Sequence, residues 1–367
     1  MATAGDIARY VDTGVASLAA CACAVQATRA TPGASARSAW IREVGGAEGT
    51  LFDLASLTKP MTAVAVARSG MDRRTTLGAL VDQLKDTESG LVPLELFLAH
   101  RAGLVAHLPL FEPLTRGAVV DREDAIFRVA KARRDDARGP APLAGFAPLY
   151  SDLGYILAGV ALAAYAGTDD AGDAIARLVL GPLGLDDRLG TARQLEARGV
   201  RLAQRAAPTE VVAFRGGTVV GRVHDENAWA LTGAGGSGHA GMFGTAEGVL
   251  SFGCEVLDAL EREPAALDWL VAERAGGTLR AGFDGKSAEG SSAGSRMGPR
   301  SFGHLGFTGT SLWIDPDAGV VVVLLTNRVH PTRDNIAIRA ARPEVHDRLY
   351  ERALALRGAT LKGQSRS

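Results

Sequence analysis

Lysine, cysteine and long apolar runs are all scarce in this chain of 367 residues. Only 5 of the 40 basic residues are lysines, so a motif that requires lysine has few ways to arise by chance. The three cysteines, Cys21, Cys23 and Cys254, cannot all be paired, and the first two are too close for an unstrained bridge. We interpret them as small buried residues and expect neither a disulfide framework nor a metal site.

The chain also lacks an excess of charge of either sign. Forty basic residues face 41 acidic ones, so the net charge is −1 and no global field favours nucleic acid or anionic lipid. No apolar run approaches the roughly eighteen residues of a membrane span, and the N-terminal segment lacks the pattern of a secretory signal. We therefore expect a compact cytoplasmic protein without a cofactor, whose partners include neither nucleic acid nor a membrane.

Secondary-structure signals occur in three blocks. The first comprises a helix over residues 4–16 and strands over 17–26 and 36–44, joined as a hairpin by the turn-forming Thr31-Pro32-Gly33. Helical spacing dominates the middle of the chain, at residues 61–68, 94–98, 125–132, 153–165 and 171–180. Strand signals return later, before a last helix over 343–356, at residues 210–214, 218–223, 309–314 and 320–326.

This order places both ends of the chain in one sheet-containing domain. We predict an α/β (α+β) protein in which residues 1–62 and 205–367 form the sheet domain and residues 63–204 a mostly helical lobe. Residues 17–44 and 302–327 are expected to share one antiparallel sheet. The Gly/Ser-rich stretch 284–300 is expected to be a flexible loop, and residues 361–367 a frayed tail.

Three short patterns resemble functional sites but lack the context that such sites require. Residues 290–294 match the Gly-x-Ser-x-Gly pattern of a hydrolase nucleophile, but no strand or helix signal flanks them. Residues 233–238 match a dinucleotide-binding pattern, but no β-rich run precedes them. The adjacent His224, Asp225 and Glu226 point in different directions on a regular backbone, so we do not interpret them as a metal site.

The pattern that carries chemistry is Ser56-Leu57-Thr58-Lys59, the only Ser-x-x-Lys in the sequence. It lies at a predicted helix start, with Pro60 in the first turn and an apolar run after it. Positions three apart share a helix face, so the serine hydroxyl and the lysine amine could come within hydrogen-bonding reach. The serine N–H would be free there to bind an oxyanion. A capping serine beside a solvated lysine is the alternative for an isolated match.

Two further segments favour the chemical interpretation. In Tyr150-Ser151-Asp152 a tyrosine precedes a predicted helix, and in His304-Leu305-Gly306 a glycine lets a strand edge approach a ligand closely. In this order, the three motifs resemble those of the serine β-lactamase and penicillin-binding-protein family, in particular its class C-like and esterase branch. The resemblance extends over residues 5–355.

The resemblance implies a β-lactamase/transpeptidase-like fold, with an antiparallel sheet flanked by helices and a helical lobe. It also implies acyl transfer through a covalent ester of Ser56. Lys59 and Tyr150 would share the general-base work, because a positive lysine favours the phenolate. The other residues that would hold the oxyanion or the substrate are Phe307, through its N–H beside that of Ser56, and Asp152, His304 and Gly306.

Two residues depart from the more common forms of these motifs. Asp152 stands where asparagine is most frequent, and His304 stands where β-lactamases commonly have lysine. A carboxylate adds negative charge near the acyl pocket, and an imidazole is mostly neutral at about pH 7. Both departures disfavour anionic β-lactam or acyl-D-alanine substrates.

We therefore predict a serine hydrolase that acts on a small neutral ester or amide. A class C-like β-lactamase or a D-alanyl-D-alanine carboxypeptidase is the alternative among enzymes, and the missing secretory signal counts against it. An alternative from another functional class is a module that binds or senses an acyl group without turnover. The presence of Asp152 favours this alternative, whereas the intact set of Ser56, Lys59 and Tyr150 argues against it. The expected partner is a small-molecule ester, amide or β-lactam.

Overall fold

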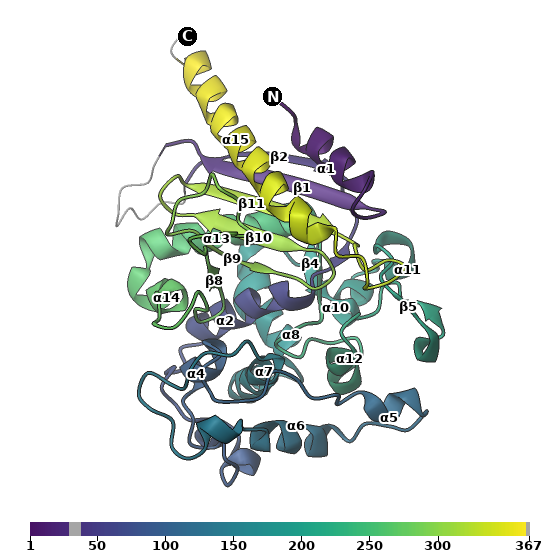
Figure 1. Ribbon diagram of the computed structural model, residues 1–367, viewed down its shortest axis with the longest axis vertical. Helices are drawn as coiled ribbons and strands as arrows, with labels where there is room; N and C mark the ends of the chain where they lie inside the picture. Colours follow the sequence, from purple (N-terminus) through teal and green to yellow (C-terminus); the bar gives the residue numbers. More distant parts are fainter. Residues whose placement is uncertain (29–37, 365–367) are drawn as a thin grey trace.

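The computed structural model describes residues 1–28 and 38–364. Its central strands are β1 (Ala19–Gln26), β2 (Trp40–Gly46), β8 (Asp284–Gly285), β9 (Phe302–Leu305), β10 (Ser311–Asp315) and β11 (Val320–Thr326). They form one antiparallel sheet in the order β2-β1-β11-β10-β9-β8 (Figure 1). The predicted fold class and the sharing of one sheet by both ends of the chain are thus confirmed. The predicted turn Thr31-Pro32-Gly33 lies outside the described residues.

The central strands β1 and β11 are buried along their whole length, because almost all of their residues are apolar. Successive side chains of a strand point to opposite faces. Ala20, Ala22 and Ala24 of β1 accordingly belong to the core that includes α13 (Ala246–Arg262), on one face of the sheet. Cys21 and Cys23 pack on the other face with α1 (Ala4–Asp12) and α15 (Ile338–Gln364), and both are free thiols. Burial raises the pKa of the Cys23 thiol to about 12, which fits the predicted role as a small core residue.

The helical part of the chain lies below the sheet in Figure 1. Its two central helices are α2 (Thr58–Arg68) and α7 (Asp152–Ala166), which contact each other. Each of them begins within one of the three motifs. The surrounding helices are α3 (Leu77–Leu80), α4 (Leu94–Leu98), α5 (Glu112–Thr115), α6 (Arg122–Lys131), α8 (Ala171–Ile175), α9 (Gly181–Leu183), α10 (Ala192–Ala197), α11 (Leu202–Arg205), α12 (Glu226–Thr232) and α14 (Pro264–Val271). The division into two lobes stays a prediction, and its boundary at residue 62 falls inside α2.

Several predicted elements differ from the structure in extent. The strand predicted over 218–223 is wrong after Thr218, because Gly217 and Gly221 both have positive φ and turn the chain. Only β5 (Val211–Val212) and β6 (Gly217–Thr218) pair there. The tail predicted over 361–367 continues α15 as far as Gln364, and the last three residues lie outside the described part. Ala293 and Met297 are buried in the α15 core, and the flexibility of residues 284–300 stays a prediction.

A small sheet that the sequence did not predict supports the nucleophile. It consists of β3 (Phe52–Asp53), β7 (Met242–Gly244) and β4 (Leu189–Thr191), with β7 in the middle. Strand β3 ends just before Ser56, so this pairing fixes the approach of the chain to α2.

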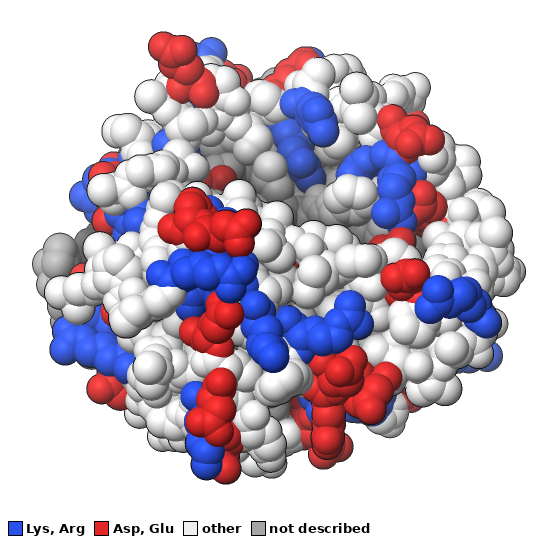
Figure 2. Space-filling model, turned by 60° about the horizontal axis from the view of Figure 1, so that its bottom comes forward, with Lys and Arg blue, Asp and Glu red and all other residues white. Residues whose placement is uncertain are grey.

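Charge on one face of the molecule and the character of the described helices both bear on possible partners. Positive and negative side chains are interspersed over the face shown in Figure 2. None of the described helices combines the length and the apolar character that crossing a membrane requires. The cytoplasmic location stays a prediction.

Candidate active site

Ser56 lies in a strained turn between β3 and α2. The turn is the 3-10 helix Ala55–Leu57, and the φ of Ala55 is 46°, in the left-handed region that residues other than glycine rarely adopt. Asp53 stabilises the turn, because its Oδ1 accepts the Ala55 N–H at 2.8 Å and its Oδ2 accepts the His224 N–H at 2.7 Å. This turn places Ser56 on the wall of a cavity.

Lys59 is fully buried and contacts both Ser56 and Asp152. Its Nζ lies 2.7 Å from Ser56 Oγ and 2.7 Å from Asp152 Oδ1, and a longer contact of 3.5 Å joins it to the carbonyl oxygen of His239. Burial alone would lower the pKa of Lys59, but the Asp152 carboxylate and Tyr150 outweigh it and raise the pKa above its ordinary value. The ammonium form of Lys59 therefore donates to Ser56.

Asp152 is held in its ionised form at the N-terminus of α7. Burial acts to raise its pKa, but Lys59 and then His239 outweigh burial and hold the pKa below the ordinary value. The backbone N–H of Asp152 donates to the carbonyl of Ala106, which fixes the start of the helix. The aspartate that departs from the common motif is thus the counter-ion of the motif lysine.

Tyr150 completes the group around Lys59. The lysine Nζ lies 4.8 Å from the centre of the Tyr150 ring, and the ring stacks on His100 with centres 4.6 Å apart. His100 is itself fixed, because its Nδ1 accepts the Ser151 N–H at 3.0 Å. Tyr150 is 37% exposed, but the protein around its hydroxyl desolvates that group and raises its pKa, while charge and hydrogen bonding from Lys59 act in the opposite direction. At rest the Tyr150 side chain is therefore a neutral phenol, and Lys59 stabilises its phenolate form.

The third motif lies on β9 and the turn that follows it. The His304 ring centre is 6.0 Å from that of Tyr150, and its Nδ1 is 2.8 Å from the carbonyl oxygen of Leu305. Burial lowers the pKa of His304 to about 3, so it supplies no positive charge near neutral pH. A Cβ at Gly306 would lie 2.0 Å from Thr310 Oγ1 and 2.6 Å from the Leu54 carbonyl oxygen, so only glycine lets this turn approach the Ser56 loop.

These elements enclose a cavity of about 510 Å³. Ser56, Tyr150 and Asp152 line it together with Gly306 and Phe307, whereas His304, expected to hold the substrate, is not part of the lining.

The lining of the cavity also includes a basic wall of three arginines, besides the carboxylates Asp225 and Glu226. This wall carries Arg328, Arg339 and Arg342, and none of the three forms an ion pair within residues 1–28 and 38–364. Arg342 donates instead to the carbonyl oxygens of Gly306 and Thr310, and burial lowers its pKa to about 10. Three guanidinium groups without carboxylate partners face the space beside the nucleophile.

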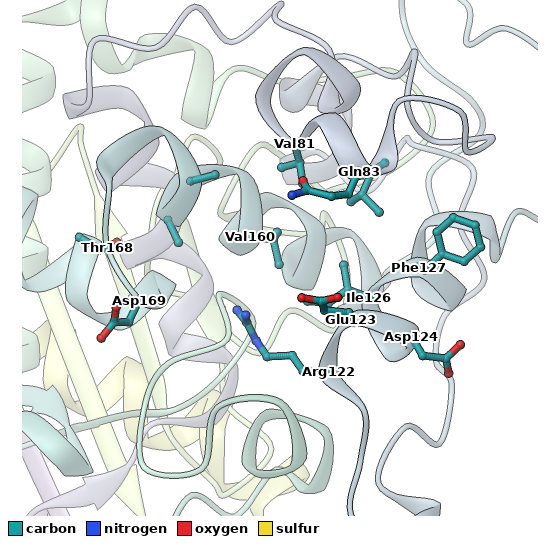
Figure 3. A pocket seen from close by; sticks show the side chains of 13 residues that line it. Val81, Gln83, Arg122, Glu123, Asp124, Ile126, Phe127, Val160, Thr168 and Asp169 are labelled. Carbon is teal, nitrogen blue, oxygen red and sulfur yellow. The ribbon is translucent and has the colours of Figure 1, made fainter.

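A second cavity, of about 490 Å³, lies in the helical part of the molecule (Figure 3). Its lining combines the apolar Ile126, Phe127 and Val160 with the charged Arg122 and Glu123. It shares no lining residue with the Ser56 cavity. Residues of all three motifs line the Ser56 cavity and none lines the second one, so the Ser56 cavity is the candidate active site.

Comparison with known proteins agrees with this geometry. A sequence model of the family described as "Beta-lactamase" matches residues 2–346. The chain belongs to the beta-lactamase family. Members and structural neighbours are hydrolases of the serine β-lactamase and penicillin-binding-protein type, so the resemblance noted in the sequence is confirmed.

Individual relatives of this beta-lactamase-family chain are distant. A protein of Escherichia coli (strain K12), named provisionally as a D-alanyl-D-alanine carboxypeptidase, is 25% identical over 312 residues, which are 77% of this chain and 70% of that protein. An N-acetylmuramyl-L-alanine amidase of Bacillus subtilis (strain 168) is 26% identical over 77% of this chain and 68% of its own length. The structure of "EstCE1, a hydrolase with promiscuous acyltransferase activity" has a TM-score of 0.65 at 18% identity, covering 94% of this chain and 96% of that one.

The sequence did not indicate every residue that surrounds Ser56. His100, which supports Tyr150, and the basic wall come from segments distant from the three motifs. The His239 backbone contacts Lys59 and its ring contacts Asp225, but the sequence assigned a catalytic or binding role to neither residue. Among the described residues no cluster of histidine, cysteine and carboxylate side chains could hold a metal ion.

Proposed function

We propose that this beta-lactamase-family chain is a serine hydrolase that forms a covalent acyl-enzyme on Ser56 and acts on a small ester or amide. The observation that carries the proposal is the position of Lys59 Nζ, buried and 2.7 Å from both Ser56 Oγ and Asp152 Oδ1. A buried ion pair placed against a hydroxyl on a strained turn is costly to build, and such features cluster at functional sites.

Tyr150 is the group that takes the proton from Ser56 in this proposal. Asp152 keeps Lys59 positive, so the lysine has no free electron pair and acts by stabilising the Tyr150 phenolate. Ser56 Oγ attacks the carbonyl carbon of the substrate as its proton passes to the phenolate oxygen. The tetrahedral intermediate then breaks the bond to the leaving alcohol or amine, which receives that proton from Tyr150.

Deacylation repeats these steps with water. Tyr150 takes a proton from water, whose oxygen attacks the ester carbon, and the bond to Ser56 Oγ breaks. Ser56 regains a proton, and the carboxylic acid leaves.

The N–H groups of Ser56 and Phe307 are proposed to bind the oxyanion. Among the described residues, the Phe307 N–H donates to no protein group, and Phe307 lines the same cavity as Ser56. Gly306 supports this role, because it lets the turn before Phe307 approach the Ser56 loop. Preorganised donors of this kind stabilise an oxyanion without reorganisation during the reaction.

Two observations bear on substrate charge. Asp152 is neutralised by Lys59, and His304 is neutral, which supports the expected neutral ester or amide. The basic wall of Arg328, Arg339 and Arg342 specifically favours the second candidate, a carboxypeptidase or β-lactamase that binds a substrate carboxylate.

The test combines turnover with mass spectrometry of the intact protein. Matched p-nitrophenyl esters with and without a carboxylate, and a chromogenic cephalosporin, are offered to the wild type and to Ser56→Ala. The proposal predicts turnover of an ester and a transient mass increase that Ser56→Ala lacks. A stable mass increase on Ser56 without turnover would support the acyl-binding module instead, and a mass increase that persists in Ser56→Ala would contradict the proposal.

A further inference from the structure

Two segments that lie outside the three motifs meet beside Lys59. One carries Asp225 at the start of α12, and the other is the glycine-rich segment before β7. His239 joins them: its Nε2 lies 2.9 Å from Asp225 Oδ1, and its Nδ1 lies 2.8 Å from Ser237 Oγ. His239 is only 1% exposed, whereas Asp225 lines the Ser56 cavity.

The glycine-rich segment needs such an anchor. Residues 235–241 contain four glycines, and Ser237 and His239 are the only polar side chains among them. A Cβ at Gly238 would lie 2.3 Å from the Tyr155 carbonyl oxygen, so the segment packs its bare backbone against α7. Thr62 of α2 donates to the Gly238 carbonyl at 2.7 Å. The imidazole of His239 adds a side-chain attachment that ties this segment to Asp225 at the start of α12.

Asp225 holds the imidazole from the cavity side. Its Oδ1 also accepts the Ala228 N–H at 2.8 Å, which ties it to the first turn of α12. Burial acts to raise the pKa of Asp225, but His239 outweighs burial and holds the pKa well below the ordinary value. An ionised carboxylate that accepts the Nε2–H of His239 fixes the orientation of the ring.

The backbone that His239 fixes touches the lysine. Lys59 Nζ lies 2.7 Å from Ser56 Oγ and 2.7 Å from Asp152 Oδ1, and the carbonyl oxygen of His239 is a longer contact at 3.5 Å. The two short hydrogen bonds set the orientation of the ammonium. The backbone of His239 packs against the same group and limits how far it can move away from Ser56.

We propose that His239, held by Asp225 and Ser237, is a positioning residue that fixes the Lys59 ammonium against Ser56. The inference rests on the proposed function, because it concerns the reactivity of Ser56. His239 is buried and does not line the cavity, so its loss should lower kcat and leave KM nearly unchanged. Small displacements of catalytic groups reduce rates by factors on the order of ten to a hundred, and we expect a loss in that range.

The experiment compares His239→Ala, His239→Gln and Asp225→Asn with the wild type. Ser56 reactivity is measured as the second-order rate of labelling by a fluorophosphonate, alongside kcat and KM for a neutral p-nitrophenyl ester. We expect His239→Ala to lose ten- to a hundredfold in labelling rate and kcat. Glutamine retains one N–H donor and should restore part of that loss. Asp225→Asn keeps the Oδ1 acceptor and should lose less than His239→Ala.

A second readout does not depend on catalysis. The chain has 5 lysines, so ¹⁵N-lysine labelling gives few side-chain signals, and burial with short hydrogen bonds should protect the Lys59 ammonium protons from exchange with water. We expect this protected signal in the wild type and its loss in His239→Ala. An unchanged signal together with an unchanged labelling rate in His239→Ala would overturn the inference. A wild type that no probe labels would refute the proposed function, while the ammonium signal would still decide the role of His239.

His346→Gln is the matched control. His346 is also buried, with Nε2 2.8 Å from Ser311 Oγ and Nδ1 2.6 Å from the Ser292 carbonyl oxygen, but it contacts neither Lys59 nor the cavity. Its substitution should lower the melting temperature and leave the labelling rate unchanged. A comparable loss of rate in His346→Gln would show that the effect of His239 is only structural and would also overturn the inference.

Discussion

At the scale of single residues, Asp152 determines which group near Ser56 can act as the base. It keeps Lys59 protonated and raises the pKa of Tyr150 by its negative charge. Tyr150 must lose its proton to act, and desolvation of its hydroxyl places its pKa above the ordinary value of about 10. We therefore predict that kcat/KM of the wild type rises with pH throughout the neutral range, because the phenolate fraction grows about tenfold per pH unit.

Asp152→Asn should move this profile to lower pH. Removing the carboxylate lowers the Tyr150 pKa, so more phenolate is present at a given pH. On the rising limb, a Tyr150 pKa that is lower by about 1 gives a rate that is roughly tenfold higher. The measurement is kcat/KM for a neutral ester as a function of pH. Asp173→Asn, which removes an aspartate paired with Arg193 outside the site, should leave the profile in place. A profile for Asp152→Asn that stays in place or moves to higher pH would refute this role.

Arg339 is expected to contribute to the choice between neutral and anionic substrates. It lines the cavity, and the part of the chain that the structure describes offers it no ion pair. Arg339→Gln should lower kcat/KM for a carboxylate-bearing ester about tenfold relative to its neutral counterpart, since a hydrogen bond to a charged group contributes about 1.5–3 kcal/mol. Arg348→Gln removes an arginine of the same helix that pairs with Glu344, and it should not change this ratio. An equal loss of kcat/KM with both esters would show that Arg339 does not discriminate between neutral and anionic substrates.

At the scale of elements, the turn after β9 is held close to the nucleophile by glycine. Gly306→Ala would place a Cβ 2.0 Å from Thr310 Oγ1 and 2.6 Å from the Leu54 carbonyl oxygen, so the turn must move. We expect a loss of about 1–3 kcal/mol in the free energy of unfolding, as for other overpacked sites, and slower labelling of Ser56. The measurements are denaturant unfolding and the labelling rate.

Gly358→Ala provides the contrast within the same chain. A Cβ at Gly358 meets nothing within 4 Å, and the residue lies inside α15. Alanine should therefore stabilise the helix by roughly 0.5–1 kcal/mol and leave labelling unchanged. If Gly306→Ala matched the wild type in both measurements, the turn would not depend on close approach.

Long elements with a regular apolar pattern could be predicted from the sequence, whereas short elements could not. Strand β11 coincides with its prediction, because seven consecutive residues that are mostly valine and leucine indicate a buried strand. Strands β3, β4 and β7 have two or three residues each and carry no alternation, so no local signal could reveal them. Their pairing depends on contacts between segments far apart in sequence.

The contacts of the candidate active site also differ in how well the sequence could predict them. The spacing of Ser56 and Lys59 is local, and the helix geometry brings the two groups together as expected. Asp225 and His239 meet across a separation of 14 residues, and no periodicity predicts that contact. The basic wall depends on where α15 crosses the cavity, which is a property of tertiary packing.

At the scale of the whole molecule, three buried histidines link stability to pH. Burial lowers the pKa of His100 and His304 to about 3 and that of His346 to about 4, against about 6.5 in the unfolded chain. The unfolded state therefore binds more protons between these values, and stability falls as pH decreases from about 6.5 towards 4. Each group contributes up to about 1.4 kcal/mol per pH unit. Thermal unfolding should show a melting temperature that decreases over this interval, less steeply in His346→Gln. A melting temperature independent of pH there would contradict these buried neutral states.

The central claim is that Ser56 is the nucleophile of this beta-lactamase-family chain, and labelling by a fluorophosphonate followed by peptide mapping tests it most directly. The arrangement of Ser56 and Lys59 predicts one adduct, located on Ser56, absent from Ser56→Ala and formed much more slowly in Lys59→Ala. An adduct on another serine such as Ser292, or labelling that continues undiminished in Ser56→Ala, would contradict it.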